Sequence, residues 1–192
     1  MPYILVLYYS LKGSTKKLAE EIGKGVLSID GIEVRLRTVP QIGNENGKEY
    51  DHIYATTQEL ADCVGLAVGS PTRFGNMAAP LKYFLDGTSG LWLAGNLVGK
   101  PACVFTSSGS MHGGQESTLL SMMIPLMHHG MIMCGVPYSV KNLNQTKTGG
   151  TPYGPSHVAR DGNLELDHDE ILIARGMGSR LAEIALKLSP NS

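Results

Sequence analysis

The sequence predicts a doubly wound α/β fold in which helices cover both faces of a five-stranded parallel sheet of order 2-1-3-4-5. Strand-length apolar runs alternate with helical patterns five times along the chain, which is typical of βαβ units. Several of these runs are continuously apolar, as in strands that are buried on both faces. A length of 192 residues fits about one domain, so residues 1–192 are expected to form a single domain.

The first half of the chain supplies three of the strands. They are predicted over Tyr3–Tyr9, Ile32–Val39 and Cys63–Gly69. A helix follows the first strand, with Ser14 or Thr15 expected as its N-cap and with Leu18, Ile22 and Val26 as its inward stripe. The segment from Pro40 to Tyr54 is polar and irregular, and a short helix is expected over Gln58–Ala61.

The second half of the chain completes the sheet. Strands are predicted over Ala102–Thr106 and Met131–Val136, and helices over Met77–Leu85, Gln115–His129 and Ile171–Leu188. The last helix carries the stripe Ile171, Ala174, Leu181, Ile184 and Leu188. Leu91–Lys100 is expected as a glycine-rich connection, and Pro137–Asp169 as a long polar excursion after strand five. Excursions of this length are usually functional or disordered.

Composition excludes several classes of protein. Hydrophobic residues make up 42% of the chain and charged residues 17%, which excludes intrinsic disorder. The formal net charge of −1 disfavours nucleic-acid binding and a strongly acidic docking face. Cys63, Cys103 and Cys134 fit no metal or redox spacing and indicate a reducing compartment. No run is long enough to span a membrane and no signal peptide is recognised, so a cytoplasmic protein is expected.

Three loops leave the carboxyl ends of the predicted strands, where ligands bind in such sheets. They are Ser10–Thr15, Ser70–Gly75 and Ser107–Gly114, all rich in Ser, Thr and Gly and without acidic residues. In the first, hydroxyls and a helix N-terminus converge, which predicts an anion site suited to a phosphate. Lys12 adds attraction, although an ordinary helix start would have similar residues.

The same loops lack the groups that other phosphate chemistries need. The Ser10–Thr15 loop is neither a nucleotide P-loop nor a dinucleotide fingerprint, and it has no cysteine nucleophile. No metal-ligand cluster or G-x-S-x-G elbow is recognised. A phosphorylated organic cofactor would supply the missing reactive group. A flavin fits, with its phosphate in the first loop and its ring between the other two.

Five segments in order carry a resemblance to a known family. They are Pro71–Met77, Gly90–Trp92, Ser108–Glu116, His128–Met131 and Gly149–Gly154. With them, the whole chain resembles the WrbA (tryptophan-repressor-binding protein) family of flavodoxin-like, FMN-dependent NAD(P)H:quinone oxidoreductases. The resemblance implies FMN as cofactor, NADH or NADPH as reductant and a quinone as substrate. It also implies a homotetramer in which neighbouring subunits complete the substrate site.

The resemblance also implies which residues contact the cofactor and the substrates. Trp92 would stand in the wall of the substrate pocket. Lys12 occupies a position where some members carry a tyrosine linked to nicotinamide-nucleotide contact, so it is a candidate substrate contact as well. The implied FMN contacts are Ser10, Leu11, Lys12, Gly13, Ser14, Thr15, Pro71, Thr72, Arg73, Phe74, Gly75, Ser107, Ser108, Gly109, Ser110, Met111, His112, Gly113 and His128.

The sequence is compatible with three candidate functions. The leading one is an enzyme in which NAD(P)H delivers a hydride to the flavin and leaves before a quinone collects two electrons in the same place, a ping-pong scheme. The second is a flavodoxin-like electron carrier, for which the expected acidic face is missing. The third is a redox-sensing regulatory binding protein, for which the sequence offers no groove-reading element or basic stripe.

Overall fold

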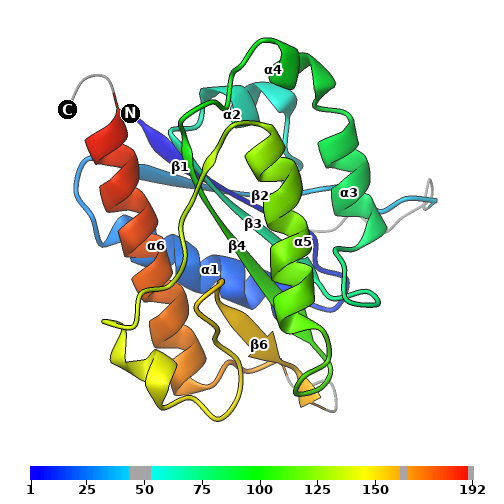
Figure 1. Ribbon diagram of the computed structural model, residues 1–192, viewed down its shortest axis with the longest axis vertical. Helices are drawn as coiled ribbons and strands as arrows, with labels where there is room; N and C mark the ends of the chain where they lie inside the picture. Colours follow the sequence, from blue (N-terminus) through cyan, green and yellow to red (C-terminus); the bar gives the residue numbers. More distant parts are fainter. Residues whose placement is uncertain (44–52, 161–163, 190–192) are drawn as a thin grey trace.

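A parallel sheet lies at the centre of the computed structural model, which describes residues 1–43, 53–160 and 164–189 (Figure 1). Its strands are β1 (Tyr3–Tyr8), β2 (Glu33–Thr38), β3 (Gly65–Pro71), β4 (Pro101–Ser108), β5 (Ile132–Met133) and β6 (Ser156–Val158). The strand order is β2-β1-β3-β4-β5, and all these neighbours pair in parallel. The predicted doubly wound fold is therefore confirmed.

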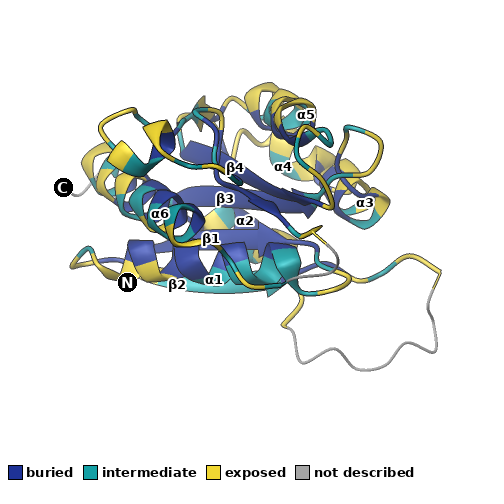
Figure 2. Cartoon of the chain, turned by 90° about the horizontal axis from the view of Figure 1, so that it is seen from below, coloured by how far each residue is buried: buried dark blue, intermediate teal, exposed yellow. Residues whose placement is uncertain are grey.

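Helices cover both faces of the sheet. They are α1 (Ser14–Leu27), α2 (Thr57–Asp62), α3 (Ala79–Asp86), α4 (Ser89–Leu93), α5 (Gln115–His128) and α6 (His168–Leu188), with a 3₁₀ turn η1 (Lys141–Asn144). Apolar residues of α1 and α6 form one core with one face of the sheet, and those of α2, α3 and α5 form a second core on the other. Figure 2 shows the buried strands between these two layers.

The central strands are buried because their sequences are apolar on both faces. All six residues of β1 and all eight of β4 are buried. Such runs suit strands that are covered by helices on either side. The edge strand β2 is mostly half-buried, in keeping with its sequence EVRLRT. The sheet therefore holds the carboxyl ends of β1, β3 and β4 rigidly at one edge.

The helix α6 packs against α1 at a crossing of small residues. A Cβ on Gly25 would lie 2.1 Å from the carbonyl oxygen of Arg175, so no larger side chain fits there. The inward face of α6 differs in part from the predicted stripe. Ala174 and Leu181 are buried as expected, but Leu188 is exposed, and Ile171 and Ile184 are only half-buried. The inward stripe runs instead through Ile173, Met177, Leu181 and Ala185.

The fifth strand position is divided between two segments. β5 is shorter than the predicted Met131–Val136 because the chain leaves β4 after Cys134, and the N–H of Val136 donates to the carbonyl of Pro152 instead. The expected excursion follows, but the chain returns within it to the sheet as β6. β6 pairs with the carboxyl end of β4, at Thr106–Ser108, on the edge that β5 occupies farther back. Residues 134–155 thus interrupt the fifth strand.

Two other segments differ from or extend the sequence prediction. The expected connection Leu91–Lys100 begins inside the short helix α4, whose first turn closes when the N–H of Trp92 donates to the Thr88 carbonyl. The helix predicted over Gln58–Ala61 is confirmed as α2. Of the polar segment from Pro40 to Tyr54, residues 44–52 lie outside the described residues.

Candidate functional site

Loop one, Ser10–Thr15, joins β1 to α1 at the carboxyl edge of the sheet. Gly13 is the N-cap of α1 with a φ of 97°, a conformation that glycine adopts at little steric cost. The prediction that Ser14 or Thr15 caps the helix is wrong, because both residues already lie within its first turn. No side-chain cap is present, so the first N–H groups of α1 remain available to an anion.

Hydrogen bonds tie loop three, Ser107–Gly114, to loop one and to loop two, Ser70–Gly75. The hydroxyls of Thr15 and Ser107 lie 2.8 Å apart, and either can donate. The N–H of Thr72 donates to the carbonyl of Ser107 at 2.8 Å. These bonds hold one residue from each loop in a fixed relation before any ligand binds.

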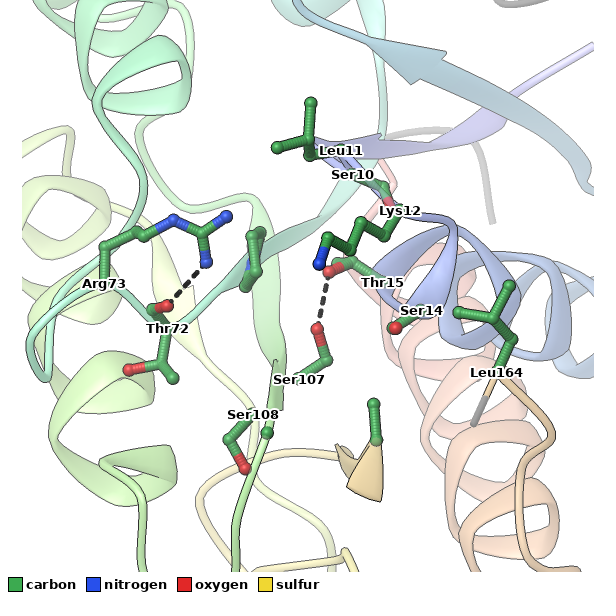
Figure 3. Close-up of a pocket in the computed structure, with 13 residues that line it drawn as sticks. Ser10, Leu11, Lys12, Ser14, Thr15, Thr72, Arg73, Ser107, Ser108 and Leu164 are labelled. Carbon is green, nitrogen blue, oxygen red and sulfur yellow. Dashed lines mark hydrogen bonds between the residues drawn. The ribbon is translucent and has the colours of Figure 1, made fainter. Parts of the chain in front are cut away.

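A cavity of about 420 Å³ opens between the three loops; we call it the first cavity (Figure 3). Its wall is made of residues from loops one to three and from the segment after β6: Ser10, Leu11, Lys12, Ser14, Thr15, Pro71, Thr72, Arg73, Ser107, Ser108, Gly109, Ala159 and Leu164. Among these described residues none is acidic. The wall offers both hydroxyl groups and apolar side chains, which suits a ligand with one anionic end and one apolar end.

Two cations reach the first cavity from different loops. Lys12 extends from loop one, and the guanidinium of Arg73 extends from loop two (Figure 3). Arg73 Nη1 donates to the carbonyl of Thr72 at 2.9 Å, which orients the guanidinium. With the N–H groups of α1, these cations make the cavity an electropositive site, and charge-assisted hydrogen bonds to an anion are stronger than neutral ones.

Loops two and three contain unusual backbone conformations. Phe74 and His112 have φ angles of 54° and 56°, which are uncommon for residues other than glycine. The Phe74 side chain is fully exposed. Gly114 comes so close to Gly75 that a Cβ on Gly114 would lie 3.0 Å from Gly75 Cα. Strained residues of this kind cluster at functional sites, where they present side chains or backbone groups to a ligand.

The structure brings many of the predicted contact residues together in the wall of the first cavity. Eleven wall residues were predicted from the sequence, namely every wall residue except Ala159 and Leu164. Others lie in the same loops without lining the cavity: Gly13, Phe74, Gly75, Ser110, Met111, His112 and Gly113. The two missed residues follow β6, whose pairing with β4 brings them to the site. β6 has the sequence SHV, and these three residues show no pattern that would predict a strand.

Trp92 and His128 lie elsewhere in the fold. They line a second cavity of about 520 Å³ between α3, α4 and α5, and their ring centroids are 6.3 Å apart. The carbonyl of Leu85 accepts the Thr88 hydroxyl proton at 2.6 Å, so His129 Nε2, 2.9 Å away, donates to the Thr88 oxygen. Burial, followed by the charge of His128, lowers the pKa of His129. In a single copy of the chain, neither Trp92 nor His128 is among the described residues that line the first cavity.

Other kinds of site receive no support from the part of the chain that the structure describes. No group of three or more His, Cys, Asp or Glu side chains there could hold a metal ion. Cys63, Cys103 and Cys134 are buried free thiols, and burial raises the pKa of Cys63 to about 11. No described helix is both long and apolar enough to cross a membrane.

Comparison with known proteins identifies relatives over nearly the whole chain. The profile of the NADPH-dependent FMN reductase family matches residues 2–144. A protein of Syntrophobacter fumaroxidans named NAD(P)H dehydrogenase (quinone) is 43% identical, over 98% of this chain and 99% of its own length. A protein of the same name from Geotalea daltonii is 43% identical, over 96% and 97%. The crystal structure of a WrbA-like flavodoxin from Agrobacterium tumefaciens covers 98% of this chain and 100% of its own with a TM-score of 0.75, at 22% identity.

Proposed function

We propose that this chain, which belongs to the NADPH-dependent FMN reductase family, is an FMN-dependent NAD(P)H:quinone oxidoreductase. The family profile and the two relatives confirm the resemblance found in the sequence. The relatives named NAD(P)H dehydrogenase (quinone) align over nearly their full length, which supports the same activity here. The first cavity carries the proposal, since its described wall offers hydroxyl, N–H and cationic groups to an anionic cofactor and no carboxylate.

The described wall fits a phosphorylated flavin. Ser10, Ser14 and Thr15, with the uncapped N–H groups of α1, would hold the phosphate. Leu11 and Pro71 offer apolar surface to the flat ring system. The ligand that this wall suits is therefore anionic at one end and apolar at the other, as FMN is.

We assign the remaining predicted contacts to FMN on the strength of the resemblance. Loops two and three supply most of them, and Phe74, which follows Arg73 of the wall, has an exposed ring that could stack on another flat ring. The contacts in question are Gly13, Phe74, Gly75, Ser110, Met111, His112, Gly113 and His128. Those in loops one to three are consistent with the cavity, because each lies within a few residues of its wall.

When bound, FMN supplies the capacity to accept a hydride from NAD(P)H and to pass two electrons to a quinone. The chain's own residues then have binding and orienting roles. Thr72 and Ser107 keep loops two and three in register through the bond from the Thr72 N–H to the Ser107 carbonyl. Arg73 and Lys12 place positive charge beside the cofactor site, which favours an anionic cofactor and its electron-rich reduced form.

The substrate site is proposed to require a second copy of the chain. Trp92 and His128 line the second cavity. The resemblance, however, implies that His128 contacts FMN and that Trp92 contacts the substrates. Both statements hold in a homotetramer in which the second cavity of one subunit faces the first cavity of its neighbour. Exposed apolar side chains on α4 and α5 support an interface here: Trp92 is 50% exposed, Leu93 78% and Ile124 60%.

NADH or NADPH is proposed as the reductant, and Lys12 as a contact to substrate as well as to FMN. Neither nucleic acid nor a membrane is proposed as a partner, in keeping with a net charge of −1. A cytoplasmic location is proposed because the three buried thiols are free, as expected in a reducing compartment.

Titration of the apo-protein with FMN tests the proposal. The flavin fluorescence and visible spectrum should change until one FMN is bound per subunit. Under anaerobic conditions the loaded protein should then oxidise more than one equivalent of NAD(P)H per flavin only when a quinone such as benzoquinone is present. A titration that leaves the flavin spectrum unchanged would overturn the proposal.

A further inference from the structure

We propose that Glu170 is a positioning residue for the cofactor site, because its buried carboxylate holds β6 and the start of α6 so that Ala159 and Leu164 form the wall of the first cavity. This inference rests on the proposed function, since it assumes that the first cavity binds FMN. Nothing in the sequence marked Glu170, which stands between the predicted excursion and the predicted last helix.

Glu170 is almost completely buried, with 1% of its surface exposed, and both carboxylate oxygens accept two hydrogen bonds. Oε1 accepts from the N–H groups of Gly149 at 2.8 Å and Val158 at 3.1 Å. Oε2 accepts from the N–H of Asp167 at 3.0 Å and from Nδ1 of the equally buried His157 at 2.7 Å. One carboxylate thereby joins the excursion, β6 and the N-cap of α6.

We call Glu170 and its four hydrogen-bond donors the clamp. Two of these donors, the N–H groups of Val158 and Asp167, lie close in sequence to residues of the cavity wall. Val158 precedes Ala159, whose N–H donates to the carbonyl of Ser108 at 2.8 Å, and both Ala159 and Ser108 line the cavity. At the other end, Asp167 stands three residues after Leu164. Leu164 closes over loop one, since a Cβ on Gly13 would lie 3.6 Å from Leu164 Cδ1, an ordinary packing distance.

The clamp is also one strand away from the proposed phosphate site. His157 of β6 is the register partner of Ser107 in β4. Paired residues in a parallel sheet point to the same face, so both side chains face α1 and α6. The hydroxyl of Ser107 in turn forms a hydrogen bond of 2.8 Å with the hydroxyl of Thr15. A shift of β6 would therefore alter the neighbourhood of loop one as well as the wall.

The chemistry of the clamp requires an ionised carboxylate. Burial of a charge costs free energy unless donors compensate for the lost water, and here four donors surround two oxygens. Replacing Glu170 with Gln keeps the shape but leaves an amide NH₂ group facing two donors, whichever way the amide turns. The substitution should therefore loosen β6 or the start of α6 rather than leave a cavity.

A matched control exists on the far side of the fold. Glu59 is the third residue of α2 and forms a capping box with Thr56, as Glu170 does with Asp167 in α6. Glu59 also accepts a hydrogen bond from a cationic side chain, Arg37, at 2.8 Å. No described residue of the first cavity contacts it through a hydrogen bond. The substitution Glu59→Gln therefore removes a similar carboxylate without touching the site.

The experiment compares the wild-type, Glu170→Gln and Glu59→Gln full-length apo-proteins. Flavin fluorescence titration gives their FMN dissociation constants, and circular dichroism gives their melting temperatures. Both variants should melt at lower temperature, but only Glu170→Gln should bind FMN more weakly. We expect a loss of about tenfold, by analogy with the removal of residues that orient metal ligands. Should Glu170→Gln fail to fold, His157→Ala removes one donor and keeps the carboxylate. It should still weaken FMN binding relative to Glu59→Gln.

The possible outcomes distinguish failure of the positioning role from failure of the proposed function. If the wild type bound FMN and Glu170→Gln, or His157→Ala in its place, bound it equally well, the positioning role would be overturned and the proposed function would stand. The same follows if Glu59→Gln weakened FMN binding as much, because the effect would then reflect stability alone. If the wild type itself bound no FMN, the proposed function would fail and the role of Glu170 with it.

Discussion

The hydroxyls of Thr15 and Ser107 meet at 2.8 Å although 91 residues lie between them in the sequence. Thr15 belongs to the first turn of α1 and Ser107 to the end of β4, so this contact joins the first and third loops of the candidate site. Both residues are buried, at 1% and 3% exposure. The contact therefore contributes to the fold as well as to the shape of the cavity.

Two substitutions in loop one should separate binding from stability. Thr15→Val leaves the Ser107 hydroxyl without this partner and should lower the free energy of unfolding as well as FMN affinity. Ser14→Ala should lower only FMN affinity, by about 0.5–1.5 kcal/mol, or up to about 3 kcal/mol if the lost bond is to the charged phosphate. Urea unfolding and FMN titration measure the two effects. Ser179→Ala on α6 serves as the control, and equal losses of affinity in Ser14→Ala and Ser179→Ala would contradict the assignment.

Arg73 and Trp92 should affect different partners. Arg73→Ala should weaken FMN retention, because the guanidinium lies at the first cavity. Trp92→Ala should leave FMN bound and raise the KM for quinone, because it removes stacking surface worth about 0.5–1.5 kcal/mol beyond area burial. Flavin fluorescence and steady-state kinetics distinguish them. Exchange of the two phenotypes between the variants would show that loop two and Trp92 have been assigned to the wrong partners.

The proposed tetramer should depend on the apolar surface of α4 and α5. Light scattering at micromolar concentration should give four times the subunit mass of 20.6 kDa. Leu93→Glu places a charge on a side chain that is 78% exposed, so it should favour smaller species without unfolding the subunit. Lys187→Glu, a charge change at an exposed position of α6 on the other face of the sheet, is the control. A monomeric wild type in the presence of FMN would contradict both the tetramer and a substrate site shared between subunits.

Acid should destabilise the chain through Glu170. Burial alone would raise the pKa of this carboxyl, but hydrogen bonds from His157, Asp167 and Val158 outweigh burial and hold its pKa below the usual 4.5. A lowered pKa in the folded state stabilises the protein above the unfolded-state pKa, and this stabilisation is lost as pH falls through the folded-state value. Urea unfolding at pH 7 and below pH 4.5 should show a smaller acid-induced loss in Glu170→Gln than in wild type. An identical loss in both proteins would contradict the clamp.

The sequence predicted the sheet and most of the cavity wall because both depend on local patterns. Buried parallel strands are continuous apolar runs, as in β1 and β4, and the topology then brings their following loops together. Loop one could be placed at the site on this ground alone. The N-cap of α1 could not be predicted in this way. Choosing between Gly13 and Ser14 requires the backbone conformation, and residue preference alone does not decide it.

Features that depend on long-range packing were not predictable in the same way. β6 is three residues long and forms because β4 offers an unpaired edge beyond β5, so Ala159 and Leu164 carried no local signal. Which residues of α6 face inward depends on its packing against α1, where Gly25 approaches the backbone of Arg175, and the apolar periodicity of α6 alone did not identify them. The position of Trp92 away from the first cavity depends on the placement of α4, a five-residue helix that overlaps the start of the predicted connection Leu91–Lys100.

The central claim is that a flavin bound in the first cavity passes two electrons from NAD(P)H to a quinone in separate steps. Its most direct test is an anaerobic visible spectrum of the FMN-loaded protein, recorded first with one equivalent of NADH or NADPH and then with one equivalent of benzoquinone. We expect the flavin absorbance to bleach with the reductant alone and to return fully with the quinone. Absorbance that NAD(P)H leaves unchanged, or that the quinone fails to restore, would contradict this account.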